Sequence, residues 1–426
     1  MMSLPWSMPS FSPSSESLHH ENNQPSVSLS EAFLDSSSRT RDSIPEQYRT
    51  HFDELRGEIL AFCHEFSIPV ETLRSKEAFG VELNSKRIPP ERMAQVVSLF
   101  ARLEYLVTNR EPLKEAPPEY LEEAERLYHL REQYTAQVAL LEQVGILKNG
   151  AITGIDGHEY PVPTLEQIAQ RLFEREKDLS VKRDQGFTKL LLVPFGMSLD
   201  ALFIVFEAFL YNYNHNTSFD LNLGEPFYIG GGDTVYQEAD IGDFPKLVYN
   251  PQSFDRHTHL GRTKTHILKE QALHPDSVAG WKIHLFQVPH DRILGLRKIL
   301  REGKGYKEGE ENPRPDFETG KSSHEYLSIL LEARNDPDNP YHGESGLTPE
   351  DWLCAFMTHL TETGEPLDDY DNDEESDCRL IGAVFSSSSA HVPVACWRRL
   401  RRQAYLGRNG PNFEIDNSGI RTSVLI

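Results

Sequence analysis

The chain has 426 residues, 38% of them hydrophobic, and its 43 basic and 66 acidic side chains give a formal net charge of -23. This length allows two or three domains. The acidic balance argues against general binding to nucleic acids or anionic membranes, because such binding needs clustered basic charge. The four cysteines include no C-x-x-C pair, so a zinc ribbon or a thioredoxin-like site is not expected. So few cysteines fit a protein of a reducing compartment.

The chain shows no targeting or membrane segment that would change this picture. The N-terminus lacks the basic and apolar regions of a secretory signal. The most apolar run, residues 190–210, is interrupted by Pro194, Gly196, Asp200 and Glu207, which is unlike a membrane span. We therefore expect a soluble cytoplasmic protein with no membrane partner.

The first third of the chain is predicted to be a tail followed by helices. Residues 1–45 are rich in Ser, Pro, Asn and Glu and lack apolar periodicity, so we expect them to be disordered. Apolar residues at helical spacing predict helices over 45–66, 89–107 and 118–144, of which the last is the longest. Three such helices with short connections indicate an antiparallel helical subdomain over 46–146.

Residues 147–345 are predicted to form a loop-rich α+β segment with a hairpin and a buried helix. The hairpin is indicated by the turn dipeptides Asn149-Gly150 and Asp156-Gly157. Thr164 and Gln167 have the capping-box spacing for a helix that runs to about residue 176. A buried strand is expected over 187–195, and Ser198 is a suitable N-cap for the helix after it. Beyond about residue 213 the pattern weakens into short mixed runs.

Residues 346–426 are predicted to form one helix and then short strands. Thr348 is expected to cap the helix, Pro349 suits its first turn and Gly364 ends it. An acidic loop follows over 368–377, and short strands continue to the C-terminus. The whole chain is therefore predicted to be α+β, with a helical N-terminal subdomain ahead of a mixed α/β domain of short irregular strands.

Two groups of side chains have features of metal sites. His257, His259 and His266 lie in a histidine-rich stretch, and neutral imidazole is a common metal ligand. No H-E-x-x-H motif accompanies them, so a polar loop with scattered histidines is the favoured interpretation.

The acidic loop has the D-x-D-x-D spacing of a calcium loop at Asp369, Asp371 and Asp373. Glu374 stands where the turn glycine of an EF-hand belongs, and Leu380 stands where its bidentate glutamate belongs. A solvated acidic loop is favoured, with a casual cation site left open. No metal and no cofactor is predicted for the protein.

The motifs of the C-terminal stretch occur in a characteristic order. They are Gly382 before a serine run at 386–388, Ala395 and Trp397 in an A-x-W strand, Arg408-Asn409 in an Asn/Arg-rich loop, and Gly419 with Arg421 at the end. This order resembles the C-terminal half of C-type-lectin-like folds, of the formylglycine-generating-enzyme type, the major-paralogous-domain type and the variable proteins of diversity-generating retroelements. The chain as a whole is similar to a group of bacterial proteins that occur as many paralogues. The resemblance implies a fold for residues 346–426, not a chemistry.

The same resemblance implies a binding role. Formylglycine-generating enzymes use a pair of cysteines, whereas only Cys396 lies in the matching strands, and the H-x-x-x-H-x-E iron motif of the sulfoxide-synthase relatives is absent. We therefore predict a non-enzymatic protein that binds a protein or carbohydrate ligand. The alternative is a divergent formylglycine-generating-enzyme-like or metal-dependent enzyme that uses Cys396 or the histidines at 257, 259 and 266.

In the retroelement variable proteins, side chains that flank the A-x-W strand and the Asn/Arg-rich loop form an exposed ligand surface. The matching positions here are Trp397, Arg398, Arg399, Arg401, Arg402, Tyr405, Arg408, Asn409, Phe413 and Asn417. Strand alternation turns only about half of them outward. Arg and Tyr are enriched at binding hot spots, which fits such a surface.

Two other uses of these arginines stay open. They could pair with the acidic loop at 368–377, where each surface pair would contribute about 0–1 kcal/mol. They could also bind nucleic acid by themselves, which the net charge disfavours.

Overall fold

The computed structural model describes residues 39–426 except 75, 87, 113–117, 233–234, 275–276, 290–293, 300–313, 371–375 and 387–389. The chain divides into two compact units, residues 1–116 and 117–426. Helices are combined with several small sheets, so the predicted α+β class is confirmed. None of the described helices is long and apolar enough to cross a membrane.

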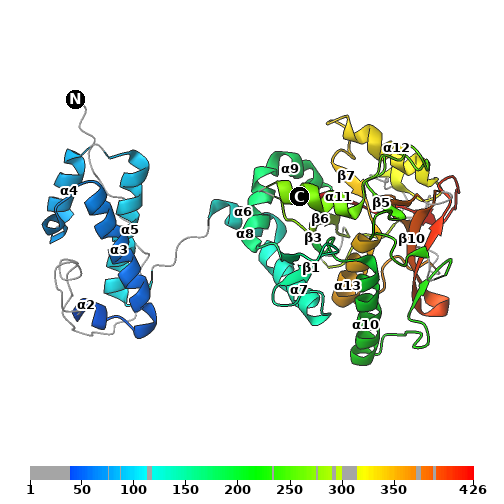
Figure 1. The fold of residues 1–426 in the computed structure, drawn as a ribbon, viewed down its shortest axis with the longest axis horizontal. Helices are drawn as coiled ribbons and strands as arrows, with labels where there is room; N and C mark the ends of the chain where they lie inside the picture. The colour runs from blue at the N-terminus through cyan, green and yellow to red at the C-terminus, as the bar shows by residue number, and fades with distance from the viewer. Residues whose placement is uncertain are drawn as a thin grey trace, which may run out of the picture. The chain divides into compact units, whose positions relative to one another are not determined.

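The first unit is a small helical bundle (Figure 1). Its elements are α2 (Arg39–Asp42), η1 (Glu46–Tyr48), α3 (Arg49–Glu65), η2 (Val70–Arg74), α4 (Lys76–Ser85) and α5 (Pro90–Asn109). α3 packs against α5, and both bury apolar residues at helical spacing, such as Phe52, Leu55 and Ile59 of α3. The helices predicted over 45–66 and 89–107 are therefore confirmed.

The beginning of this unit differs from the disordered tail predicted for residues 1–45. Residues 39–42 form α2, and Ile44 is buried in the apolar core of the bundle. A single buried isoleucine is too little for a periodic pattern, so the order was not visible in the sequence. Residues 1–38 lie outside the described part of the chain.

The boundary between the units lies earlier than the predicted one near residue 146. The longest predicted helix is in fact two, α6 (Glu119–Tyr128) and α7 (Leu130–Gln143), because His129 between them has left-handed backbone angles. Both belong to the second unit. Gln137 of α7 hydrogen-bonds the backbone of strand β3 (Phe187–Val193), against which α7 packs. Helical spacing predicts a buried face but does not say which core buries it.

The second unit contains all remaining elements. Its other helices are α8 (Leu165–Glu174), α9 (Glu176–Asp184), α10 (Leu199–Thr217), α11 (Lys264–Leu273), η4 (Pro315–Phe317), α12 (Ser323–Arg334), α13 (Pro349–Thr363) and η5 (Arg399–Arg401). Its other strands are β1 (Ala151–Thr153), β2 (Glu159–Pro161), β4 (Phe227–Ile229), β5 (Leu247–Tyr249), β6 (Lys282–Gln287), β7 (Glu344–Gly346), β8 (Asp377–Arg379), β9 (Ala383–Phe385), β10 (Val392–Arg398), β11 (Gln403–Asn409), β12 (Ser418–Gly419) and β13 (Thr422–Leu425).

The local predictions within this unit are largely confirmed. β1 and β2 form the expected hairpin, and Asn149-Gly150 makes a turn with positive φ at both residues just before it. Thr164 forms its capping box at the start of α8, which ends at Glu174, and the Ser198 hydroxyl accepts from the backbone N–H of Ala201 in α10. Gly364 ends α13 in the left-handed conformation.

The strands form two larger sheets. One has four antiparallel strands in the order β3-β6-β13-β7, and the other has five strands in the order β12-β8-β10-β11-β4. β5 and β9 form a separate pair, as do β1 and β2. Because the last strand, β13, lies between β6 and β7, the predicted region 346–426 shares one core with earlier residues and is not a separate domain.

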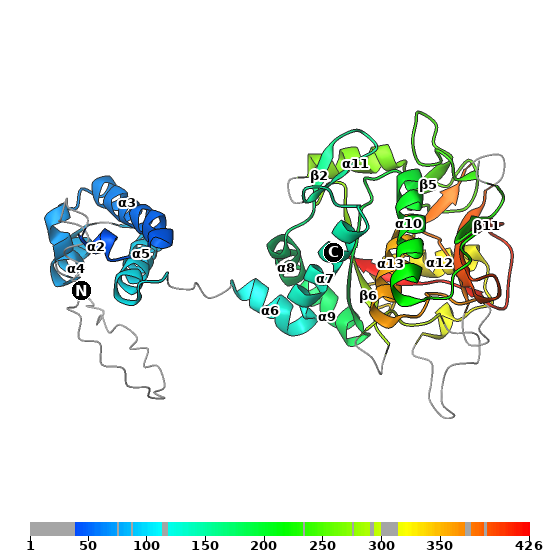
Figure 2. The ribbon, with the colours of Figure 1, turned by 90° about the horizontal axis from the view of Figure 1, so that it is seen from below.

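Helices α10 and α13 fill the space between the two sheets (Figures 1 and 2). Phe206 of α10 lies 5.1 Å from the ring of Phe227 in β4 and 5.4 Å from Phe356 of α13. Phe356 in turn lies 6.1 Å from the ring of Trp397 in β10. These aromatic contacts cover the face of the five-stranded sheet from which Trp397 projects.

A buried ionic cluster holds the start of α13 in place. The ammonium group of Lys264 lies 2.5 Å from Asp240 and 2.8 Å from Glu350, and all three side chains are fully buried. The Tyr249 hydroxyl donates to Glu350 at 2.6 Å. Burial opposes the charge on Lys264, but Glu350 and Asp240 outweigh it and raise the pKa of Lys264 above its ordinary value. The three elements that meet here are thus tied by charges that depend on one another.

Candidate functional site

The candidate site is the face of the five-stranded sheet that α10 and α13 leave uncovered. The strand register places Cys396 opposite Tyr405, and Tyr405 opposite Tyr228, so these three side chains project from the same face. Trp397 and its register partner Ala404 project from the other face, towards the helices. Arg398 lies two residues after Cys396 in β10 and is therefore on the outer face with the tyrosines.

Tyr228, Tyr405 and Arg398 form a stack on this outer face, called here the tyrosine–arginine stack. The rings of Tyr228 and Tyr405 have centroids 6.0 Å apart and are inclined by only 19°. The guanidinium carbon of Arg398 lies 3.5 Å from the Tyr405 ring centroid and 6.0 Å from that of Tyr228. Tyr228 is 37% exposed, and Arg398 and Tyr405 are half-buried. The arrangement is a cation–π contact at the protein surface, near the sheet edge formed by β4.

Two glycines make room for the Tyr405 ring. A Cβ atom at Gly407, two residues further along β11, would overlap the Tyr405 hydroxyl, and one at Gly230, directly after β4, would do the same. Both glycines therefore allow the ring to lie flat along the sheet. The "GGG" run at 230–232 has this packing role at its first position.

The same face of the sheet carries a buried carboxyl group on β8, beside Cys396. Asp377 of β8 is nearly fully buried, and burial raises its pKa to about 6. Cys396 is also buried, and burial raises the pKa of its thiol well above the ordinary value. Since a thiolate is the reactive form of cysteine, this environment does not favour Cys396 as a nucleophile.

The sequence-predicted residues separate into four groups in the structure. Trp397 is 3% exposed and contacts Phe219 and Phe356, so it is a packing residue and cannot contact a ligand directly. Arg398 and Tyr405 belong to the tyrosine–arginine stack. Arg408 alternates to the other side of β11, next to Gly231.

The remaining predicted residues lie at the hairpin tip or in the loop beyond β11. Arg399, Arg401 and Arg402 form the exposed turn between β10 and β11. Asn409 ends β11 and is half-buried, as is Asn417, whereas Phe413 is 64% exposed. The structure therefore does not bring these residues into the stack, and Asn417 lies beside β8, at the far edge of the sheet from β4.

Within the described residues, one ion pair links the arginines at 398, 399, 401, 402 and 408 to the acidic loop at 368–377. The Nε atom of Arg399 donates to Asp369 at 2.6 Å. Arg402 pairs instead with Asp220, at 3.1 Å, outside the acidic loop. Asp371 and Asp373 lie outside the described residues, as do Ser387 and Ser388.

The histidine stretch is not assembled into a metal site. His257 and His266 are exposed, and His266 lies 3.0 Å from Glu270, one turn further along α11. His259 uses its Nδ1 atom to accept from the backbone N–H of Gly261. In the described part of the chain, no three His, Cys, Asp or Glu side chains are grouped so that they could hold a metal ion.

Tyr228, the most exposed member of the stack, was not predicted from the sequence. Its partner strand β11 is far along the chain, and the pairing between β4 and β11 is parallel, so no turn links them. The only local signal was an aromatic run ended by glycines, "PFYIGGG".

The chain was compared with family models, with curated proteins and with solved structures, and it matches none of them.

Proposed function

We propose that the protein is a non-enzymatic binding protein whose ligand surface is the tyrosine–arginine stack of a lectin-like C-terminal region. The observation that carries the proposal is the solvent-facing stack of Arg398 on Tyr405 and Tyr228. Tyrosine and arginine are the residue types that most often dominate binding energy at protein interfaces. Among the described residues, no acidic side chain forms an ion pair with Arg398, so its remaining N–H groups are available to acceptors on a ligand.

The ligand proposed is a protein segment rather than a carbohydrate. A flat pair of tyrosines offers a large rigid contact area at small entropic cost. The guanidinium group of Arg398 can donate to carboxylate or carbonyl oxygens beside it. β4, which presents Tyr228, is also an edge strand, and edge strands can pair with an extended peptide.

The test is selection of peptides from a random display library on the purified protein, followed by measurement of their dissociation constants. Tyr228→Ala and Arg398→Gln should each weaken binding by about 30-fold, as expected for hot-spot residues that contribute about 2 kcal/mol. The matched control is Phe173→Ala on α8, which removes an aromatic side chain that is 40% exposed. Peptides that bind all variants equally would refute the proposal, and glycans whose binding depends on the same residues would replace the proposed ligand class.

The lectin-like fold and the paralogous family are part of the same proposal. If the stack is a diversified binding surface, paralogues should vary at the outward positions 228, 398 and 405. They should keep apolar residues at the inward positions 227, 397 and 404. Sequencing the paralogues of one genome provides this comparison, and equal variation at both sets would argue against diversification.

A further inference from the structure

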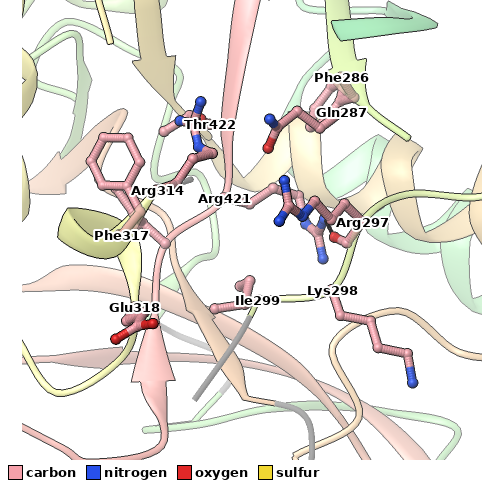
Figure 3. A pocket seen from close by; sticks show the side chains of 11 residues that line it. Phe286, Gln287, Arg297, Lys298, Ile299, Arg314, Phe317, Glu318, Arg421 and Thr422 are labelled. Carbon is pink, nitrogen blue, oxygen red and sulfur yellow. Dashed lines mark hydrogen bonds between the residues drawn. The ribbon is translucent and has the colours of Figure 1, made fainter. Parts of the chain in front are cut away.

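A small cavity in the second unit lies outside the tyrosine–arginine stack and shares no residue with it. Its volume is about 50 Å³, and its walls come from the end of β6, the start of β13, residues 297–299 and the segment around η4. Figure 3 shows Arg297, Arg314 and Arg421 around it, with Phe286 and Ile299 among the apolar residues. Because one water needs roughly 10–15 Å³, the cavity can hold a group of a few heavy atoms.

The lining of this cavity is strongly basic in a chain that is acidic overall. Four lining side chains are cationic, Arg297, Lys298, Arg314 and Arg421, and among the lining residues Glu318 is the acidic one. Two of the arginines are held from behind by buried carboxylates. Arg314 lies 3.0 Å from Glu344, which Lys182 also pairs with, and Arg421 lies 2.5 Å from Asp368. These carboxylates orient the two guanidinium groups.

Arg421 has a donor that the described residues leave unused. Its side chain is only 6% exposed, with one terminal nitrogen on Asp368 and the other on the backbone carbonyl of Arg297. Its Nε–H is buried and has no hydrogen-bond acceptor in the described part of the chain. A buried donor without an acceptor is costly, so the protein partners of Arg421 leave part of its hydrogen-bonding capacity unused.

A neighbouring histidine reports the positive potential at this place. Burial lowers the pKa of His359, and the charges of Arg421, Lys298 and Lys189 act in the same direction, so that together they bring it to about 3. The Nδ1 atom of His359 accepts from the backbone N–H of Leu296 at 2.9 Å, as a neutral ring does. The positive charge near the cavity is therefore fixed and does not depend on this histidine.

We propose that the cavity binds a phosphate group, either free phosphate or the phosphate of a small phosphorylated molecule. Several arginines that converge on one small space match the several oxygens and the double charge of a phosphate. The apolar side chains at the cavity wall provide a surface for the rest of a phosphorylated molecule.

The test is calorimetric titration of the full chain with inorganic phosphate, methyl phosphate and acetate at constant ionic strength. Both phosphates, or inorganic phosphate alone, should bind, and Arg297→Gln should weaken that binding by about tenfold, which corresponds to one lost charge-assisted hydrogen bond. Arg256→Gln, an exposed arginine of the same unit, is the control and should leave binding unchanged. Arg297 is half-buried, and an unchanged circular dichroism spectrum and melting temperature without phosphate would show that its variant folds.

Three results would overturn the phosphate site. They are no binding of either phosphate to the wild type up to about 10 mM, equal weakening by Arg256→Gln, and acetate binding as tight as that of phosphate. Phosphate should also raise the melting temperature of the wild type more than that of Arg297→Gln, in proportion to their affinities. None of these results bears on the tyrosine–arginine stack, so the two proposals can fail separately.

Discussion

Lys264→Met is expected to destabilise the second unit severely. The substitution removes the cation that lies 2.5 Å from Asp240 and 2.8 Å from Glu350, and it leaves two fully buried carboxylates without their partner. Breaking a buried pair in this way costs about 3–5 kcal/mol, because the remaining charge stays in a low-dielectric environment. The same reasoning predicts that the triple variant with Asp240→Asn and Glu350→Gln regains most of the loss, since it removes the charges together.

Urea unfolding followed by tryptophan fluorescence measures this loss in the correct unit. Three of the four tryptophans, Trp281, Trp352 and Trp397, belong to the second unit, and the fourth, Trp6, lies outside the described residues, so a Trp6→Phe background is used for all variants. Lys177→Met, an exposed lysine on α9, is the control and should change stability by less than about 0.5 kcal/mol. A loss below about 1 kcal/mol for Lys264→Met, or a triple variant as unstable as the single one, would refute the reasoning.

Three further predictions concern pH and packing. Burial raises the pKa of Asp377 from 3.8 to about 6, so its stabilising contribution is present below pH 3.8 and is lost as the pH rises through about 6. The free energy of unfolding of Asp377→Asn should therefore rise by up to about 3 kcal/mol relative to the wild type across that range. A difference in urea unfolding that stays constant with pH would contradict this. Burial and nearby cations lower the pKa of His359 from 6.5 to about 3, so the stability of the wild type should fall as the pH decreases from 6.5 to 3. His359→Gln should lose less stability over the same range. Equally steep losses in the two proteins would count against this assignment. Gly382→Ala would push a Cβ against the backbone carbonyls of residues 346 and 347 and should lower stability by about 1–3 kcal/mol in thermal unfolding. Gly57→Ala in α3 is the control: its added Cβ would have no neighbour within 4 Å, and it should stabilise by about 0.5–1 kcal/mol. A neutral Gly382→Ala would show that the backbone around residues 346 and 347 can move apart.

The sequence predicted the elements whose causes are local. The capping box at Thr164, the N-cap at Ser198 and the glycine stop at Gly364 each involve side chains or backbone angles within a few residues. The hairpin after Asn149-Gly150 has the same origin. These predictions hold because the neighbouring residues alone satisfy the backbone groups.

The elements that were missed depend on contacts between distant parts of the chain. α7 was assigned to the N-terminal bundle because its spacing could not show that Gln137 bonds to β3. The last strand was assigned only to a C-terminal region over 346–426, because nothing within residues 422–425 indicates that they insert between β6 and β7.

The candidate site was predictable to the same extent. Alternation along β10 and β11 predicts that about half of the named residues point outward, and the register then decides that Arg398 and Tyr405 do while Trp397 does not. Tyr228 could not be found, because its place beside Tyr405 comes from a parallel pairing between distant strands.

The central claim is that the tyrosine–arginine stack is the ligand surface of this protein, and the dissociation constant of a library-selected peptide tests it most directly. Tyr228→Ala should weaken binding of that peptide by about 30-fold, and Phe173→Ala should leave its dissociation constant unchanged. Equal affinity of the wild type and Tyr228→Ala for every selected peptide would contradict the claim.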